Sequence, residues 1–164
     1  KNCFELDSFQ ADSALVEMAQ KWGGDIQWTS KGLLVSSLNT LKPFEVNGSQ
    51  FPDLVPALAF LASHIEGESV LSRLSILHFK ESDRVDQLLR LLKLFSVDHR
   101  YIPERDEIRI QGKVVKYSET NVSLARDHRI VMTAYLFLRK NSGGLLAEID
   151  CIEKSFPHFL EKMA

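Results

Sequence analysis

Four short polar clusters in the sequence contain carboxylates or small polar groups, and three of them add arginine or lysine. A carboxylate beside a cation can carry a proton, and arginine offers a planar fork that binds a carboxylate or a phosphate through two hydrogen bonds. Together these residue types predict chemistry on small anionic substrates. The clusters are Gln50–Asp53, Lys80–Arg84, Asp127–Arg129 and Lys154–Pro157.

Each cluster stands where an apolar helical pattern begins, and a helix N-terminus offers free N–H groups and a positive dipole end to an anion. Purely structural roles also fit these residues. Asp53 and Asp127 suit helix N-caps, Lys80–Arg84 suits a solvated charge run, and Lys154 suits a surface position. Four such coincidences in one chain favour the functional interpretation.

The apolar spacing predicts the helices that would position these clusters. Capping residues and glycines mark their ends. We expect one helix after Asp12 that stops at Gly23–Gly24, a second from near Asp53 to Gly67, a third from Ser82 or Asp83 to Phe95, a fourth from Asp127 to before Gly143, and a short fifth from Ser155 to Met163.

Strand patterns fill the gaps and reveal an internal repeat. Two hairpins are predicted, over 25–29 with 32–36 and over 99–103 with 107–111, and single strands over 69–77 and 145–151. Helices and strands recur at an offset of a little over seventy residues. The pattern predicts an α+β fold of about two βαβαββ units, roughly 1–78 and 79–151, followed by a C-terminal helix over 155–163.

Composition limits the classes of function. The chain has 164 residues, 45% of them hydrophobic, with a net charge of −2 and a pI of about 6.2. These values argue against nucleic-acid binding, and the absence of a long apolar run predicts no membrane segment. No export signal is visible, so we expect a cytoplasmic protein. Cys3 and Cys151 could form a disulfide, but two buried thiols are the better interpretation.

Four segments in this order resemble the signature segments of EPSP synthases: FPDLVPALAFLA, KESDR, RDHRIVM and CIEKSFPHF. The resemblance covers essentially the whole chain. It implies a fold of two lobes, each of three βαβαββ units, of which this chain would be about two units of the C-terminal lobe. The other lobe would be missing, and because the chain begins with Lys1 we expect a piece of a longer protein that is inactive alone.

The resemblance also implies a reaction and residue roles. Phosphoenolpyruvate and shikimate 3-phosphate would give 5-enolpyruvylshikimate 3-phosphate and phosphate, with no metal or cofactor, and glyphosate would be an inhibitor of the complete enzyme. The implied catalytic residues are Asp53, the candidate base, and Glu81 and Lys154, which serve proton transfer. Lys80 would bind shikimate 3-phosphate, Arg84, Arg129 and Lys154 would bind phosphoenolpyruvate, and Asp127 would support its neighbours.

Two departures from the family pattern concern the shikimate site: His78 stands where an arginine is common, and Ile76 replaces an asparagine. Two alternative functions remain open. One is a UDP-N-acetylglucosamine enolpyruvyl transferase, which the motifs fit poorly. The other is a non-catalytic βαβαββ module of the kind found in RNA-binding proteins, which would need a basic face with exposed aromatic residues.

Overall fold

The computed structural model describes residues 13–37, 41–113, 120–141 and 143–163. Within these ranges the five predicted helices and both predicted hairpins are present, with ends shifted by a few residues. The helices are α1 (Ala14–Lys21), α2 (Val55–His64), α3 (Arg84–Leu94), α4 (His128–Lys140) and α5 (Phe159–Met163). The strands are β1 (Asp25–Thr29), β2 (Gly32–Ser37), β3 (Glu45–Asn47), β4 (Gly67–Ser72), β5 (Asp98–Ile102) and β6 (Glu107–Gly112).

Four strands form one mixed sheet in the order β3-β4-β6-β5. β3 runs parallel to β4, and the pairs β4–β6 and β6–β5 are antiparallel. Along the chain the elements read β3-α2-β4-α3-β5-β6, which is a complete βαβαββ unit between residues 45 and 112. The α+β class and the predicted type of repeat are therefore confirmed.

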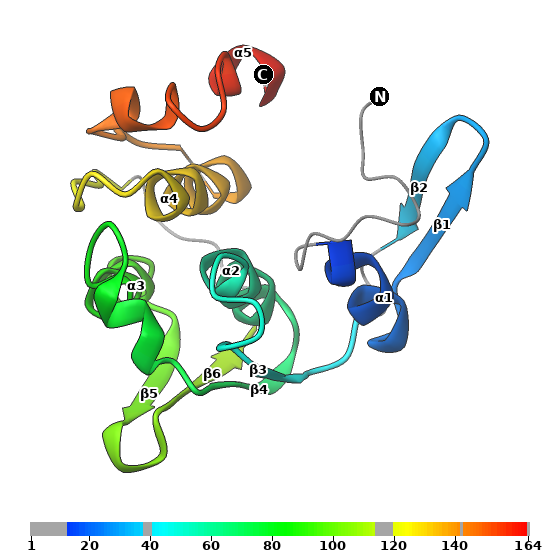
Figure 1. Ribbon diagram of the computed structural model, residues 1–164, viewed down its shortest axis with the longest axis horizontal. Helices are drawn as coiled ribbons and strands as arrows, with labels where there is room; N and C mark the ends of the chain where they lie inside the picture. The colour runs from blue at the N-terminus through cyan, green and yellow to red at the C-terminus, as the bar shows by residue number, and fades with distance from the viewer. Residues whose placement is uncertain (1–12, 38–40, 114–119, 142, 164) are drawn as a thin grey trace.

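Parts of the same unit flank the complete one. The segment α1-β1-β2 repeats the order of α3-β5-β6, and its hairpin stands apart from the four-stranded sheet (Figure 1). On the other side, a parallel bridge joins Val122 to Leu146 around α4, as β3 and β4 pair around α2. The four-stranded sheet combines β3 and β4, which precede residue 78 in the sequence, with β5 and β6, which follow it. The division into units 1–78 and 79–151 stays a prediction.

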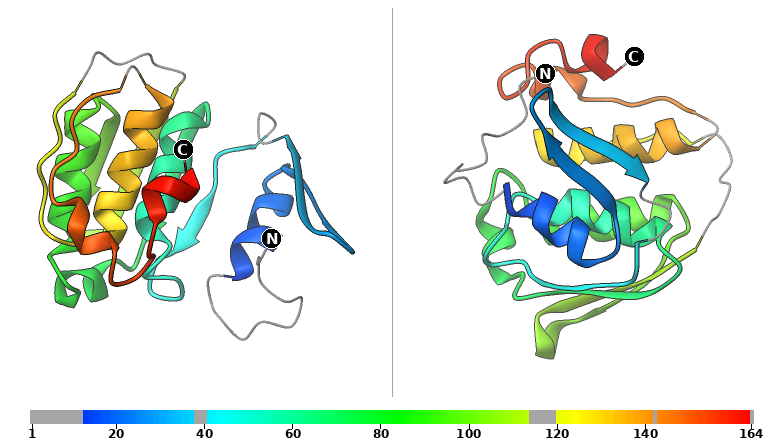
Figure 2. Two further views of the ribbon diagram at one scale, coloured as in Figure 1. Left: turned by 90° about the horizontal axis from the view of Figure 1, so that it is seen from above. Right: turned by 90° about the vertical axis from the view of Figure 1, so that its right-hand side faces the viewer.

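The helices lie on one face of this sheet. α2 and α3 pack against it and α4 packs across both, so that the three helices run side by side (Figures 1 and 2). Alternation along β6 explains the arrangement, since Ile108 and Ile110 are fully buried beneath the helices while Arg109 points to the opposite face. The core between these layers contains Leu58, Leu88 and Phe137.

Three predicted elements were wrong in extent or type. The strand expected over 69–77 ends at Ser72, because Arg73 adopts a positive φ of 56° and residues Ser75–Phe79 form a 3-10 turn, η2. The strand expected over 145–151 is only the bridge at Leu146, since Glu148 also has a positive φ and begins a second 3-10 turn, η4 (Ile149–Ile152). The last helix begins at Phe159, two residues after Pro157 rather than before it.

One glycine fixes the distance between α2 and the sheet. A β-carbon at Gly112 would overlap the carbonyl oxygens of Ala62 and Ile65, at the end of α2. Because these are main-chain atoms, a larger residue could be accommodated only by moving the helix away from β6. The packing of α2, and with it the position of the helix start near Asp53, therefore depends on this glycine.

Three further expectations concern a membrane segment, a metal ion and the two cysteines. Within the described ranges, no helix is both long and apolar enough to cross a bilayer. Across the same residues, His, Cys, Asp and Glu side chains form no group of three or more that could hold a metal ion. Cys151 is a partly buried free thiol. Cys3 and the predicted cap residue Asp12 lie outside the described residues.

Candidate active site

The starts of α2, α3 and α4 meet at the side chain of Arg84. This guanidinium is 1% exposed and contacts three carboxylates. Its Nε donates to Oδ2 of Asp127 at 2.7 Å, its Nη1 donates to Oδ1 of Asp53 at 2.7 Å, and its Nη2 donates to Glu81. Burial opposes the charge, but the hydrogen bonds to Asp127 and Asp53 outweigh it and raise the pKa of Arg84 further.

Asp127 is both a helix cap and a partner of Arg84. Its Oδ1 accepts hydrogen bonds from the backbone N–H groups of Arg129 at 3.0 Å and Ile130 at 3.5 Å, which caps α4 as expected. Its Oδ2 accepts from Arg84 and from the hydroxyl of Ser82 at 3.1 Å. The carboxylate is fully buried, so its two roles lock the start of α4 to the start of α3.

Asp53 does not cap a helix. The N-cap of α2 is Leu54, and the Asp53 carboxylate turns instead toward three cations. Oδ2 accepts from Nη2 of Arg129 at 2.9 Å, and Oδ1 lies 3.6 Å from Nζ of Lys80 in addition to its bond with Arg84. The interpretation of Asp53 as a plain N-cap is thus wrong. Asp127 does act as an N-cap, and it also pairs with Arg84.

These contacts lower the pKa of the Asp53 carboxyl. Partial burial acts in the opposite direction and is the largest single influence, but the hydrogen bond from Arg84 and the charges of Arg129, Lys80 and Arg84 together exceed it. The group is therefore ionised at neutral pH. Three cations face three carboxylates in this cluster, which we call the Arg84 cluster: Asp53, Lys80, Glu81, Arg84, Asp127 and Arg129.

The structure does not bring Lys154 into the Arg84 cluster. Lys154 lies two residues after η4, is exposed, and forms no ion pair with the described residues. Its position nevertheless repeats that of Lys80, which directly follows η2. The two lysines thus occupy similar places in consecutive βαβ segments, each after a turn that follows a short strand or bridge.

The two departures from the family pattern lie beside the cluster. Nδ1 of His78 is 2.8 Å from Oδ2 of Asp83, the residue that caps α3 through the N–H of Asp86. His78, at the position where an arginine is expected, therefore contacts the residue that caps α3. Ile76 is exposed on η2.

Three residues have supporting roles that the sequence did not predict. Ser82 supports Asp127, as described above. Gln87, one turn after Arg84, accepts from the N–H of Ala125 at 2.8 Å and so fixes the loop before α4. Arg126 pairs with Glu148 and Asp150, which ties the same loop to η4 and the segment that carries Lys154. Only the spacing of Gln87, three residues after Arg84 on the same helix, could have suggested such a role.

The comparisons with known proteins agree on one family. The model of the EPSP synthase (3-phosphoshikimate 1-carboxyvinyltransferase) family matches residues 2–163. The 3-phosphoshikimate 1-carboxyvinyltransferase of Methanosphaera stadtmanae is 30% identical over 165 residues, which covers 99% of this chain and 37% of that protein. The corresponding protein of Pyrococcus abyssi is 35% identical over 154 residues, covering 93% of this chain and 36% of that protein.

Solved structures show the same fold. An EPSP synthase from Acinetobacter baumannii superposes with a TM-score of 0.70 at 24% identity, covering 91% of this chain and 37% of that one. An enolpyruvyl transferase from Streptomyces tendae gives 0.62 at 15% identity, with 88% and 33% covered. The chain therefore spans little more than a third of the length of the relatives it matches. Since the family model covers nearly every residue, the chain belongs to the EPSP synthase family.

Proposed function

We propose that the chain is part of a two-lobed enzyme that transfers the enolpyruvyl group of phosphoenolpyruvate to the 5-hydroxyl of shikimate 3-phosphate and releases phosphate. The observation that carries this proposal is the Arg84 cluster, which gathers cations and carboxylates from three helix starts into one place. Both proposed substrates are anions, and the transfer needs proton donors and acceptors beside bound phosphate and carboxylate groups.

The proposed roles are those that the resemblance to the EPSP synthase family implies, and the role of Lys154 requires its segment to approach the Arg84 cluster in the complete protein. Asp53 takes the proton from the 5-hydroxyl of shikimate 3-phosphate as the oxygen of that hydroxyl attacks C2 of phosphoenolpyruvate. Glu81 and Lys154 deliver a proton to C3 and later remove one from it. Elimination then breaks the bond from C2 to the phosphate oxygen. Lys80 holds the phosphate of shikimate 3-phosphate, while Arg84, Arg129 and Lys154 hold phosphoenolpyruvate. Asp127 keeps Arg84 and the start of α4 in place.

Arg84 is 1% exposed and each of its nitrogen atoms contacts a carboxylate, so a substrate would reach it most readily by taking the place of one partner. Glu81 is the partner that leaves most readily, since its side chain is 51% exposed whereas Asp127 is fully buried. A carboxylate or phosphate of phosphoenolpyruvate would then replace Glu81 on the guanidinium. The exchange would free Glu81 to carry a proton at the moment when the substrate arrives.

Substrate binding to the arginines would also change the environment of Asp53. Its lowered pKa makes it a weak base while Arg84 and Arg129 both contact it. When an anionic substrate draws these arginines away, the stabilisation of the Asp53 carboxylate decreases and its pKa rises toward the ordinary value. The carboxylate would thus become a better proton acceptor only in the substrate complex.

The remaining half of the site would come from the lobe that this chain lacks. We therefore expect the chain alone to be inactive, the complete protein to need no cofactor or metal, and glyphosate to compete with phosphoenolpyruvate. Neither lobe is expected to bind nucleic acid or a membrane, and we assign the reaction to the cytoplasm.

The test is phosphate release by the complete protein from phosphoenolpyruvate with shikimate 3-phosphate, compared with UDP-N-acetylglucosamine as the acceptor. Phosphate release that occurs with shikimate 3-phosphate as the acceptor and not with UDP-N-acetylglucosamine supports the proposal. Phosphate release only with the nucleotide sugar contradicts it. Arg129→Met should reduce turnover strongly. Arg139→Met is a matched control, since Arg139 is exposed near the far end of α4 and bonds only to Tyr135 among the described side chains.

A further inference from the structure

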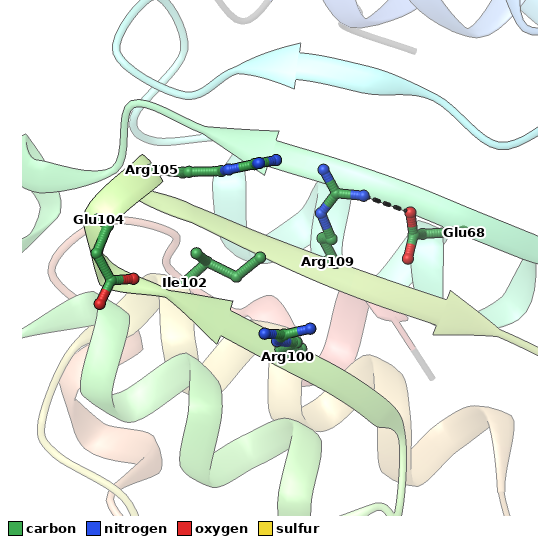
Figure 3. Close-up of a pocket in the computed structure, with 6 residues that line it drawn as sticks. All are labelled: Glu68, Arg100, Ile102, Glu104, Arg105 and Arg109. Atoms are coloured by element: carbon green, nitrogen blue, oxygen red, sulfur yellow. Dashed lines mark hydrogen bonds and ion pairs between the residues drawn. The ribbon is translucent and has the colours of Figure 1, made fainter.

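A second group of charged side chains lies on the face of the sheet that the helices leave uncovered. Six residues line a hollow of about 490 Å³ there: Glu68, Arg100, Ile102, Glu104, Arg105 and Arg109 (Figure 3). They come from β4, β5, β6 and the turn between β5 and β6. Because Ile108 and Ile110 on β6 face the helices, the outward Arg109 places this hollow on the opposite side of the sheet from the buried core.

The strand register places two arginines directly opposite each other. Arg100 on β5 pairs with Arg109 on β6. Like charges in this position destabilise a sheet unless carboxylates or a bound anion compensate them. Arg109 is compensated, since its Nη1 contacts Glu68 at 2.8 Å and its Nε contacts Glu107 at 3.0 Å.

Arg100 lacks such compensation, and that of Arg105 is weak. Among the described residues, the Arg100 side chain makes no hydrogen bond or ion pair, and the guanidinium of Arg105 comes no closer to a carboxylate than 3.9 Å, to Glu107. The same Glu107 oxygen already accepts from Arg109. Two guanidinium groups on one wall of the hollow are therefore available to a ligand.

The turn that carries Arg105 is held in place from outside the hollow. Asp106, at the end of the turn, adopts a positive φ of 51° and accepts hydrogen bonds from the N–H of Ser75 at 3.0 Å and from its hydroxyl at 2.5 Å. This anchors the turn to η2. The backbone of the turn at Arg105 is thus positioned relative to Arg100 before any ligand binds, which lowers part of the entropy cost of binding.

We propose that this hollow binds a small molecule through an oxyanion head group, a carboxylate or a phosphate, held between Arg100 and Arg105 with Ile102 against its apolar part. Arginine forks suit these groups because they bind them in a planar, two-bond geometry. Glu68 and Glu104 on the rim limit the excess of positive charge, which favours a small head group over an extended polyanion. The site is independent of the Arg84 cluster and does not rest on the proposed reaction.

The test is an amide NMR titration of the 164-residue chain with inorganic phosphate and, separately, with acetate. We expect saturable shifts that concentrate in residues 100–105 and at residue 109 with at least one of the two anions. Arg100→Gln and Arg105→Gln should each weaken this binding about tenfold, since each removes one charge-assisted fork. Arg100→Lys should give an intermediate loss, and Arg139→Gln should leave binding unchanged.

The outcomes separate this site from the Arg84 cluster. Shifts near residues 53, 81–84 and 129 would report binding at the Arg84 cluster. Only shifts in residues 100–109 test the proposed site in the hollow. The inference is overturned if neither anion produces saturable shifts around the hollow, or if such shifts persist at full affinity in Arg100→Gln combined with Arg105→Gln. A dispersed spectrum of each variant serves as the check that it remains folded.

Discussion

Arg84 and Asp127 form a buried ion pair in which Nε of the arginine donates to Oδ2 of the aspartate at 2.7 Å. The pair joins the first residue of α3 to the cap of α4, forty-three positions later in the chain. Burying two charges is costly, and the additional hydrogen bonds from Ser82 and the α4 backbone offset part of that cost. Loss of one partner alone should therefore be far more damaging than loss of both.

Arg84→Met should reduce the free energy of unfolding by about 3–5 kcal/mol, because it leaves the Asp127 carboxylate buried without its cation. Urea unfolding followed by circular dichroism measures this change. Combining it with Asp127→Leu should recover part of the loss. As a control, Arg90→Met removes an exposed pair with Asp86 and should cost less than about 1 kcal/mol. Equal losses in the single and double variants would refute the buried-pair argument.

Asp53 should make the stability of the chain depend on acid pH. Its pKa in the folded state is lowered, so the unfolded chain takes up a proton at a higher pH than the folded one does. Its contribution is therefore complete above about pH 4, the ordinary value, and is lost as the pH falls through the lowered folded pKa. Urea midpoints measured from pH 6 to pH 2 should fall more steeply for the original chain than for Asp53→Asn. Parallel curves would contradict the prediction.

His64 should add a second dependence at higher pH. Burial is the main cause of its lowered pKa, and the nearby charge of Lys140 acts in the same direction, against the raising effect of its bond to the Phe60 carbonyl. Its buried Nε2 has no hydrogen-bond partner among the described residues. The histidine therefore favours the folded state fully above about pH 6.5, and that contribution declines as the pH falls below this value.

His64→Leu should accordingly flatten the decline in stability between pH 7 and pH 5, measured by thermal unfolding at each pH. His158→Gln is the control, because that side chain is 66% exposed and, among the described residues, its only charged contact is Glu161. A decline that is flattened equally by both variants would mean that titration of His64 is not its cause.

Lys154 allows function to be separated from stability. Since its side chain is exposed and unpaired within the described residues, Lys154→Met should leave the unfolding free energy of the chain within about 0.5 kcal/mol of its original value. In the complete protein the same change should lower turnover by about 10²–10³, the usual effect of removing one stabilising group from a reacting centre. Normal turnover in this variant would remove Lys154 from the proposed mechanism.

Much of the fold could be predicted because local signals agreed with the global arrangement. Asp83 before the apolar stripe of α3, and Asp127 before that of α4, are caps in the structure as predicted. The hairpins followed from alternation and turn residues. β3 was not predicted because it is only three residues long, too short to show alternation. It lies in the short segment between Pro43 and Gly48.

The sequence indicated which charged residues gather at the starts of α2, α3 and α4, with the exception of Lys154, better than it indicated their geometry. The type and order of residues indicated an anion site, yet nothing in the letters KESDR shows that Arg84 is buried while Glu81 is half exposed. That difference arises from packing between α3 and α4, across more than forty residues. The separation of Lys154 from the Arg84 cluster and the uncompensated Arg100 likewise depend on tertiary contacts and strand register, which short sequence patterns do not encode.

Gly112 illustrates a consequence for mutational scanning. Every substitution there would push a side chain into the main chain at the end of α2, so all nineteen replacements should score as poorly as changes at Arg84. Gly112 lies on β6 and would touch neither substrate of the proposed reaction. A scan of all substitutions would therefore mark this contact between α2 and β6 as intolerant to the same degree as the reacting groups. Only assays that report protein abundance and turnover separately would distinguish the two.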